Sequence, residues 1–240
     1  MQDGGLTAGI ALGYVHTILN LPTTGYAGGS QSTIGSVTTM IYGKYRDQGL
    51  RLQGLMGYTS EAIHGVRNLP NTGLAAISDH HGSMIHALFQ GGYAIATPVV
   101  TVTPNLGIAW YRQTQPGFSE TGATTLFDLH YLHQTVSALE VSAGLSLSRH
   151  YHLGSMQIIP YADIAVQRNL DNNRRSIREV LGDLQPVSET GVAPDKTALL
   201  TNVGTSIRIA NSLSLYAEYE GCYAGNISSN GLAAGGVWRW

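Results

Sequence analysis

The sequence closes with the stretch Gly231-Leu232-Ala233-Ala234-Gly235-Gly236-Val237-Trp238-Arg239-Trp240. Side chains of a β-strand alternate between its two faces, so one face of this stretch is apolar with two tryptophans and the other has small residues and one arginine. A soluble strand with such an aromatic edge invites aggregation. In a membrane β-barrel, tryptophan at the lipid–water boundary instead contributes to the aromatic girdle. The stretch therefore favours a strand of a membrane barrel.

The same alternation recurs along the chain and predicts about ten strands of roughly 10–14 residues, the length that tilted membrane strands need. They lie at 5–17, 34–46, 50–59, 83–94, 99–112, 135–150, 156–168, 197–209, 212–223 and 231–240. The connections after the first, third, fifth and seventh strands are long, and the intervening ones are short, as in barrels with outer loops and periplasmic turns. We therefore predict an all-β fold, an antiparallel up-and-down transmembrane β-barrel, in one domain over residues 1–240.

Composition excludes several classes of function. The net charge of −2 offers no basic patch for nucleic acid, and the single Cys222 excludes a disulfide framework or a cysteine zinc site within one chain. No cofactor or metal is expected. The start at Met1 lacks a signal peptide, so an envelope protein with this sequence is expected to be a mature form or a fragment. The alternative is a soluble β-sandwich or lipocalin-like barrel, but the face opposite the apolar one is glycine, serine, threonine and asparagine rather than charged.

Several stretches resemble the C-terminal β-domain of bacterial autotransporters, the type V secretion family. They are the closing strand, the tyrosine-acid-glycine run in 212–221, Val102-Thr103-Pro104 to Trp110, Phe118-Ser119-Glu120-Thr121-Gly122-Ala123, Ile159-Pro160-Tyr161-Ala162 and the opening Gly9-Ile10-Ala11-Leu12-Gly13-Tyr14. The family barrel has twelve strands behind a helical linker. The chain resembles that domain without its first two strands and its passenger, which leaves a truncated sequence, a fragment and a smaller closed barrel as alternatives.

The resemblance implies a translocator in the bacterial outer membrane that exports a passenger to the surface. It implies three partners: outer-membrane lipid, the barrel-assembly machinery and the protein's own passenger domain. The closing strand resembles the assembly signal, at Gly235, Trp238, Arg239 and Trp240, although a girdle anchor explains the tryptophans equally well. The residues Phe118, Glu120 and Gly122 match a mid-chain family motif.

Parity of the strands predicts which charged and aromatic side chains line the lumen. The candidates are Asp163, Arg208, Tyr216, Glu218 and Glu220, together with Lys44, Arg51, Glu140 and Arg239. We expect Arg239 to face Glu218 or Glu220 and to stabilise the pore wall. The alternative is that these are solvated charges that contribute little.

No catalytic residue is expected, and the sequence holds no recognisable catalytic motif. Two enzymatic alternatives stay open. Some family barrels cleave their own passenger with lumen acids, for which Asp163, Glu218 or Glu220 are candidates. A ten-stranded outer-membrane protease of the omptin type works with histidine and paired acids, for which Asp79-His80-His81 is a candidate in the predicted loop 60–80. A passive pore or adhesin-type barrel is the third alternative.

Overall fold

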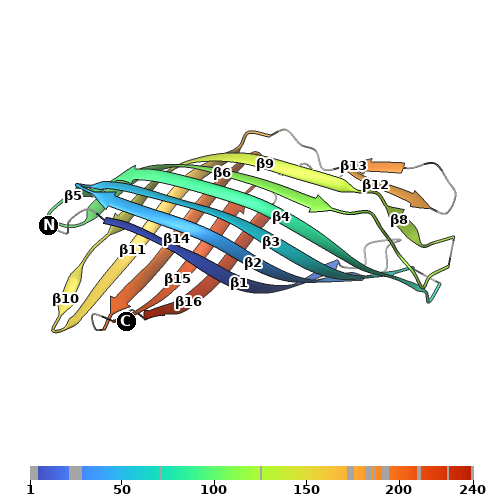
Figure 1. Ribbon diagram of the computed structural model, residues 1–240, viewed down its shortest axis with the longest axis horizontal. Helices are drawn as coiled ribbons and strands as arrows, with labels where there is room; N and C mark the ends of the chain where they lie inside the picture. Colours follow the sequence, from blue (N-terminus) through green and yellow to red (C-terminus); the bar gives the residue numbers. More distant parts are fainter. Residues whose placement is uncertain are drawn as a thin grey trace.

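The computed structural model describes residues 5–21, 29–70, 72–124, 126–171, 176–181, 185, 187–190, 195–209, 212–225 and 227–238. Ten strands form one antiparallel sheet in which each strand pairs with its neighbours in the chain (Figure 1). They are β1 (Gly5–Leu21), β2 (Ser30–Asp47), β3 (Leu50–Asn68), β4 (Ala75–Tyr93), β6 (Thr101–Gln115), β9 (Gln134–Ser148), β11 (Met156–Asn169), β14 (Thr197–Arg208), β15 (Leu213–Ala224) and β16 (Ile227–Trp238). This order confirms the predicted all-β, up-and-down fold. Over the same residues, no helix is long and apolar enough to cross a membrane.

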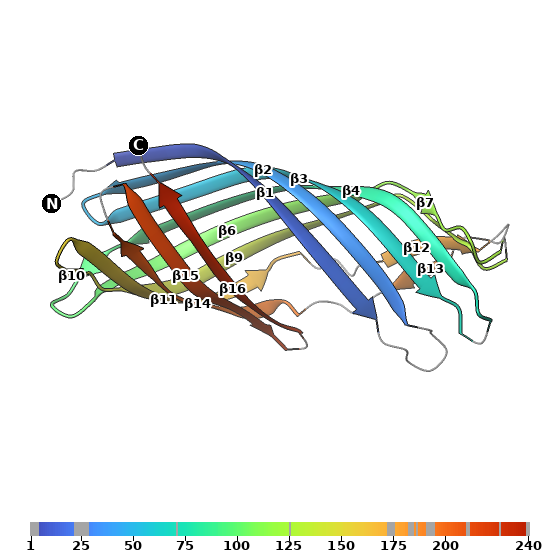
Figure 2. The ribbon, with the colours of Figure 1, turned by 90° about the horizontal axis from the view of Figure 1, so that it is seen from below.

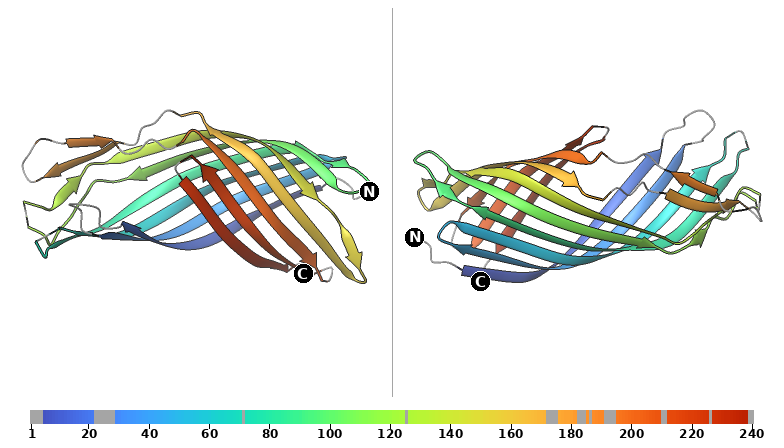
Figure 3. Two further views of the ribbon diagram at one scale, coloured as in Figure 1. Left: turned by 180° about the vertical axis from the view of Figure 1, so that it is seen from behind. Right: turned by 90° about the horizontal axis from the view of Figure 1, so that it is seen from above.

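The sheet curls into a half-barrel, and Figures 2 and 3 show its concave interior and its two edges. The edges are β1 and β16: within the described ranges β1 pairs only with β2, and β16 only with β15. The pairing that would close the barrel is therefore not made between these two strands.

The two faces of the sheet differ sharply in polarity. The convex face exposes large apolar side chains, among them Leu12 (76% exposed), Leu106 (69%) and Leu232 (87%). In water such a surface would be strongly unfavourable, at roughly 25 cal/mol per Å² of apolar area. The concave face carries the alternate residues, which are mostly small or polar. The sheet thus has its apolar surface on the outside, as a lipid-embedded barrel requires.

Two hairpins are longer than predicted. Strand β1 continues to Leu21 and β2 begins at Ser30, so both ends of the expected loop at 18–33 are strand. The expected loop at 60–80 is also mostly strand, because β3 runs to Asn68 and β4 starts at Ala75. The polar residues of this hairpin satisfy one another across the strands, as where His64 lies opposite Asp79 with 2.8 Å between Nδ1 and Oδ1. The polar residues were expected to form a loop, but they continue the strand pairing.

The connections sort the sheet into two ends. We call the end that holds the links 48–49, 94–100, 149–155 and 209–212 the short-turn end, and the opposite end the long-loop end. Strand β1 begins and β16 ends at the short-turn end (Figure 1). Two small strands extend the sheet there, β5 (Ile95–Ala96) beside β6 and β10 (Tyr151–Leu153) beside β11. The predicted alternation of long and short connections is thus largely confirmed. The connection between β3 and β4, at 69–74, was predicted to be long but is short, because the two strands extend into it.

A second sheet lies at the long-loop end. It has the order β13-β12-β8-β7 and contains β7 (Phe118–Ser119), β8 (Leu129–Tyr131), β12 (Ser176–Leu181) and β13 (Val187–Thr190). Figure 1 shows it beyond the ends of β6 and β9. Two of the long connections therefore form a structure together, which periodicity within each of them did not reveal.

Candidate functional site

Cross-strand register places the predicted lumen residues on the concave face. Asp163 pairs with Ser146 on one side and with Asn202 on the other, and Asn202 pairs in turn with Glu220. Because directly opposed residues share a face, this links all four side chains to one surface. The same parity places Arg208, Tyr216 and Glu218 on that surface.

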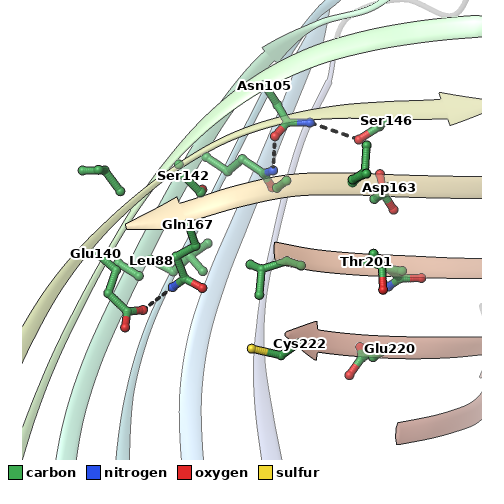
Figure 4. Close-up of a pocket in the computed structure, with 18 of the residues that line it drawn as sticks. Leu88, Asn105, Glu140, Ser142, Ser146, Asp163, Gln167, Thr201, Glu220 and Cys222 are labelled. Atoms are coloured by element: carbon green, nitrogen blue, oxygen red, sulfur yellow. Dashed lines mark hydrogen bonds between the residues drawn. The ribbon is translucent and has the colours of Figure 1, made fainter. Parts of the chain in front are cut away.

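A hydrogen-bonded ladder of amides crosses the concave face from β3 to β9. The Gln53 amide nitrogen donates to Gln90, the Gln90 amide donates to Asn105 Oδ1 (2.9 Å), and the Asn105 amide donates to Ser146 Oγ (3.1 Å). Figure 4 shows the Asn105–Ser146 bond and, further along, Gln167 bonded to Glu140. These side chains line a hollow of about 680 Å³. The concave face therefore supplies donors and acceptors to whatever occupies it.

Three acids of this face, Asp163, Glu218 and Glu220, lie on β11 and β15, and Glu218 is held by neutral partners. Glu218 Oε2 accepts hydrogen bonds from the Tyr161 hydroxyl (2.7 Å) and from the Asn202 amide (3.1 Å). The residues opposite the acids on β16 carry no charge, because Glu218 faces Ala233 and Glu220 faces Gly231. The expected partner Arg239 lies outside the described residues. Within the described strands, Tyr161 and Asn202 are hydrogen-bond partners of Glu218.

The closing strand β16 packs closely against β15. Gly235 lies directly opposite Tyr216, and a Cβ at Gly235 would lie 2.7 Å from the Tyr216 ring. Only glycine leaves room for the ring to lie across the strand, so the fit of β15 on β16 depends on this residue. Trp238 is 67% exposed and faces the convex side, where a girdle residue belongs. Trp240 lies outside the described residues.

The mid-chain motif forms a set of contacts at the long-loop end that we call the clasp, made by residues 116–133 against β3 and β4. Glu120 is only 6% exposed, and its carboxylate accepts two hydrogen bonds from the Arg67 guanidinium and one from the Leu129 amide (3.0 Å). Thr121 forms an isolated bridge with Ile77, extending the edge of β4. The motif glutamate is therefore a structural anchor of the clasp.

Aromatic stacking supports the same contacts. The centre of the Phe118 ring lies 3.7 Å from the centre of the His80 imidazole and 4.6 Å from the centre of the Tyr131 ring, and Phe118 is nearly parallel to both rings. Burial, followed by the charges of Glu120 and Glu179, raises the pKa of Tyr131 to about 12. Gly122 has a φ of +105°, a conformation that favours glycine. All three motif residues thus have a packing role in the clasp.

The Asp79-His80-His81 run does not converge on one point. Asp79 and His81 lie on the convex side by strand parity, where Asp79 contacts His64, whereas His80 lies on the concave side and stacks on Phe118. A catalytic histidine needs its acid on the same side. Over the part of the chain that the structure describes, no group of three or more histidine, cysteine or acidic residues could hold a metal ion.

Sequence reasoning missed Arg67, the amide ladder and the second sheet. Parity alone could have put Gln53, Gln90 and Asn105 on one face, because each lies on a strand with clear alternation. Their contact depends on register, which depends on turn geometry and on the pairing of distant segments. Arg67 lies in a region interpreted as loop, so no signal pointed to its partner.

Comparisons with known proteins agree on one family. A family model described as the autotransporter beta-domain matches residues 1–220. The translocator domain of autotransporter NalP from Neisseria meningitidis superposes with a TM-score of 0.77 at 17% identity, over 98% of this chain and 74% of that one. The beta domain of the Bordetella autotransporter BrkA gives a TM-score of 0.65 at 18% identity, over 99% of this chain and 84% of that one. No curated protein matches the sequence significantly.

Proposed function

The chain belongs to the autotransporter β-domain family, outer-membrane β-barrels that export a passenger domain, and on this premise we propose that its concave face lines the export path. The lining comprises the amide ladder and the acids Asp163, Glu218 and Glu220. The proposal also includes lipid contact along the convex face and insertion by the barrel-assembly machinery.

The contrast between the two faces of the sheet carries this proposal. A polypeptide that crosses a membrane in an extended form must keep its backbone groups hydrogen-bonded, which hydrocarbon cannot provide. The concave face offers amide donors and acceptors at Gln90 and Asn105 and small residues elsewhere, so water and side chains can solvate the moving chain. The convex face is apolar and suits lipid.

A matched pair on β16 tests the assignment of faces. Ala233 and Ala234 are adjacent and identical, yet Ala233 lies opposite Glu218 on the concave side and Ala234 faces outward. We expect Ala234→Arg to destabilise the folded protein in lipid by about 2–4 kcal/mol, because arginine at the membrane centre is costly. Ala233→Arg is expected to fold normally. Urea unfolding in lipid vesicles measures the difference, and equal losses in both variants would contradict the assignment.

Export itself is tested with the chain linked to an epitope-tagged passenger in Gram-negative cells. We expect the tag to be removed by protease added to intact cells, and heat-modifiable migration to report a folded barrel. A folded barrel with its passenger left in the periplasm would overturn the proposal. Because folding is scored separately, a misfolded variant is not mistaken for failed export.

Recognition by the assembly machinery is proposed for the closing strand, through Gly235, Trp238, Arg239 and Trp240. Trp238→Ser separates recognition from anchoring. If Trp238 is a recognition residue, its substitution slows insertion into membranes that contain the machinery and leaves spontaneous refolding in detergent unchanged. If both processes are slowed equally, Trp238 is a girdle anchor only.

The protein is proposed to have no catalytic activity of its own. For peptidase chemistry, this is supported by the placement of Asp79 and His80 on opposite faces of β4. For passenger cleavage, it is supported by Glu218, whose carboxylate is engaged in a hydrogen bond from the neutral Tyr161 hydroxyl. We expect the passenger to stay covalently attached at the surface. A passenger that is released by the wild type and retained by Glu218→Gln or Glu220→Gln would contradict this, as would peptidase activity lost in His80→Ala.

A further inference from the structure

Two arginines lie directly opposite each other at the short-turn end of the concave face. Arg46 near the end of β2 pairs in register with Arg51 at the start of β3, and Lys44 lies one position further along the same face. Like charges directly opposed across a strand pair are destabilising. The short turn at Gln48 and Gly49 therefore joins two strands whose facing side chains repel each other.

A third arginine reaches the same end from a distant hairpin. Arg208 on β14 lies opposite Gln157, whose side-chain amide is 3.0 Å from His150 Nδ1. Arg208 Nε is buried and has no hydrogen-bond partner within the described residues. A buried N–H donor without an acceptor is destabilising, because it has lost its hydrogen bonds to water and gained none in return. The structure thus contains a buried donor that has no acceptor within the described residues.

His150 lies in the turn after β9, at the same short-turn end. Burial, and then the charges of Arg51, His152, Arg208 and Arg46, lower the pKa of this histidine. The β2–β3 arginines and Arg208 lie on the same concave face and at the same short-turn end, and the charges of Arg46 and Arg51 act on His150 although about 100 residues separate them in the sequence. We call the group of Arg46, Arg51, His150, His152 and Arg208 the cationic mouth.

No carboxylate in the described ranges compensates the cationic mouth. The two ion pairs within the described ranges, His64–Asp79 and Arg67–Glu120, both lie at the long-loop end. Asp47 follows Arg46 but points to the opposite face by strand parity. Glu218 is held by Tyr161 and Asn202. A cluster of cations with an orphaned donor and no local acid has the electrostatics of an anion site.

We propose that the cationic mouth binds the carboxylates of an acidic segment of the linked passenger chain at the short-turn entrance to the export path. This inference rests on the proposed function, because the concave face must be the path. Guanidinium groups fit carboxylates in bidentate pairs, and the arginines come from two separate hairpins at one end of the concave face, so an extended acidic segment can contact both. A lipid phosphate is a poorer fit, because the cluster faces away from the lipid-exposed surface.

The binding test uses the full chain refolded in detergent micelles. The probes are a labelled ten-residue glutamate peptide, a glutamine peptide of equal length and inorganic phosphate. We expect the glutamate peptide to bind and the glutamine peptide not to bind. Arg51→Gln and Arg208→Gln should each weaken binding about tenfold, as expected for the loss of charged hydrogen bonds. Binding should also raise the pKa of His150, measured by NMR, because a bound anion offsets the neighbouring cations.

Arg149→Gln is the matched control. Arg149 precedes His150 in the same turn, but its guanidinium lies 4.9 Å from the centre of the Tyr151 ring and outside the cationic mouth. It should leave binding unchanged. Equal loss in all three variants, binding of the glutamine peptide, or inorganic phosphate binding as tightly as the glutamate peptide would each overturn the proposal, the last by revealing an adventitious ion only.

Export separates this inference from the proposed function. We expect Arg51→Gln with Arg208→Gln to slow export of a passenger with an acidic segment next to the barrel and to leave a neutral segment unaffected. Normal export of both segments would refute the anion site and leave the export path standing. Failure of every passenger on a folded barrel would refute the export path itself.

Discussion

Arg67 at the long-loop end is paired with a buried carboxylate, whereas Arg46, Arg51 and Arg208 at the short-turn end meet no acid within the described residues. The first arrangement is permanent, because the partner Glu120 belongs to the same chain and is almost fully buried. The second is open to a partner that arrives and leaves. Charge is thus used for structure at one end of the sheet and is left available for binding at the other.

The largest expected effect is loss of the clasp on removal of its acid. Glu120→Gln leaves Arg67 with a neutral partner in a site where the Glu120 side chain is 5% exposed. Breaking a buried ion pair destabilises by roughly 3–5 kcal/mol. Hydrogen exchange should show faster opening of 116–133 with an unchanged sheet. The control is Glu61→Gln, whose carboxylate accepts a hydrogen bond from the Gln113 amide on an exposed surface, at 3.0 Å. Equal protection in both variants would mean that the clasp does not depend on this pair.

A smaller effect is expected from the motif glycine. Gly122→Ala must hold a φ of +105° and would place its Cβ 3.1 Å from the Ala75 carbonyl oxygen. The cost is about 1–3 kcal/mol, expressed as faster proteolysis of 116–133. Gly73→Ala also has a positive φ, of +71°, but meets nothing within 4 Å. Equal proteolysis rates in the two variants would show that the contact with Ala75 is unimportant.

The clasp should also respond to alkaline pH. Tyr131 has a pKa raised to about 12 by burial, so the folded clasp favours its protonated form. Its contribution to stability is therefore fully present below the ordinary value near 10 and is lost as the pH rises from there toward 12. Hydrogen exchange or proteolysis of 116–133 across this range measures the loss, and Tyr131→Phe should remove the dependence. A Tyr131→Phe variant that opens over the same range as the wild type would assign the transition to another group.

The smallest effect has the opposite sign and belongs to the short-turn end. Arg46→Gln removes one of two opposed arginines and should stabilise the β2–β3 hairpin by about 0.2–1 kcal/mol at low salt, with the gain fading as salt screens the repulsion. Lys44→Gln is the control, because Lys44 lies opposite the neutral Gln53. Destabilisation by Arg46→Gln in urea unfolding would mean that Arg46 already has a partner, which would remove the contrast between the two ends.

Alternation by itself determined the ten strands, their antiparallel order and the faces of Asp163, Arg208, Tyr216, Glu218 and Glu220. The period of two is a local property of an extended backbone, so each stretch of about ten residues carries the information. The family resemblance came separately, from short sequence motifs. Alternation could not extend β3 to Asn68, because the polar residues there look like loop until their partners on β4 are known.

Tertiary structure decided everything that joins distant segments. The contact of Glu120 with Arg67 spans 53 residues, and the cationic mouth joins the β2–β3 hairpin to β14. Such contacts depend on register and curl, which arise from the whole sheet and not from any one strand. The sequence thus determined which side each residue faces, and the three-dimensional fold determined which residues it meets there.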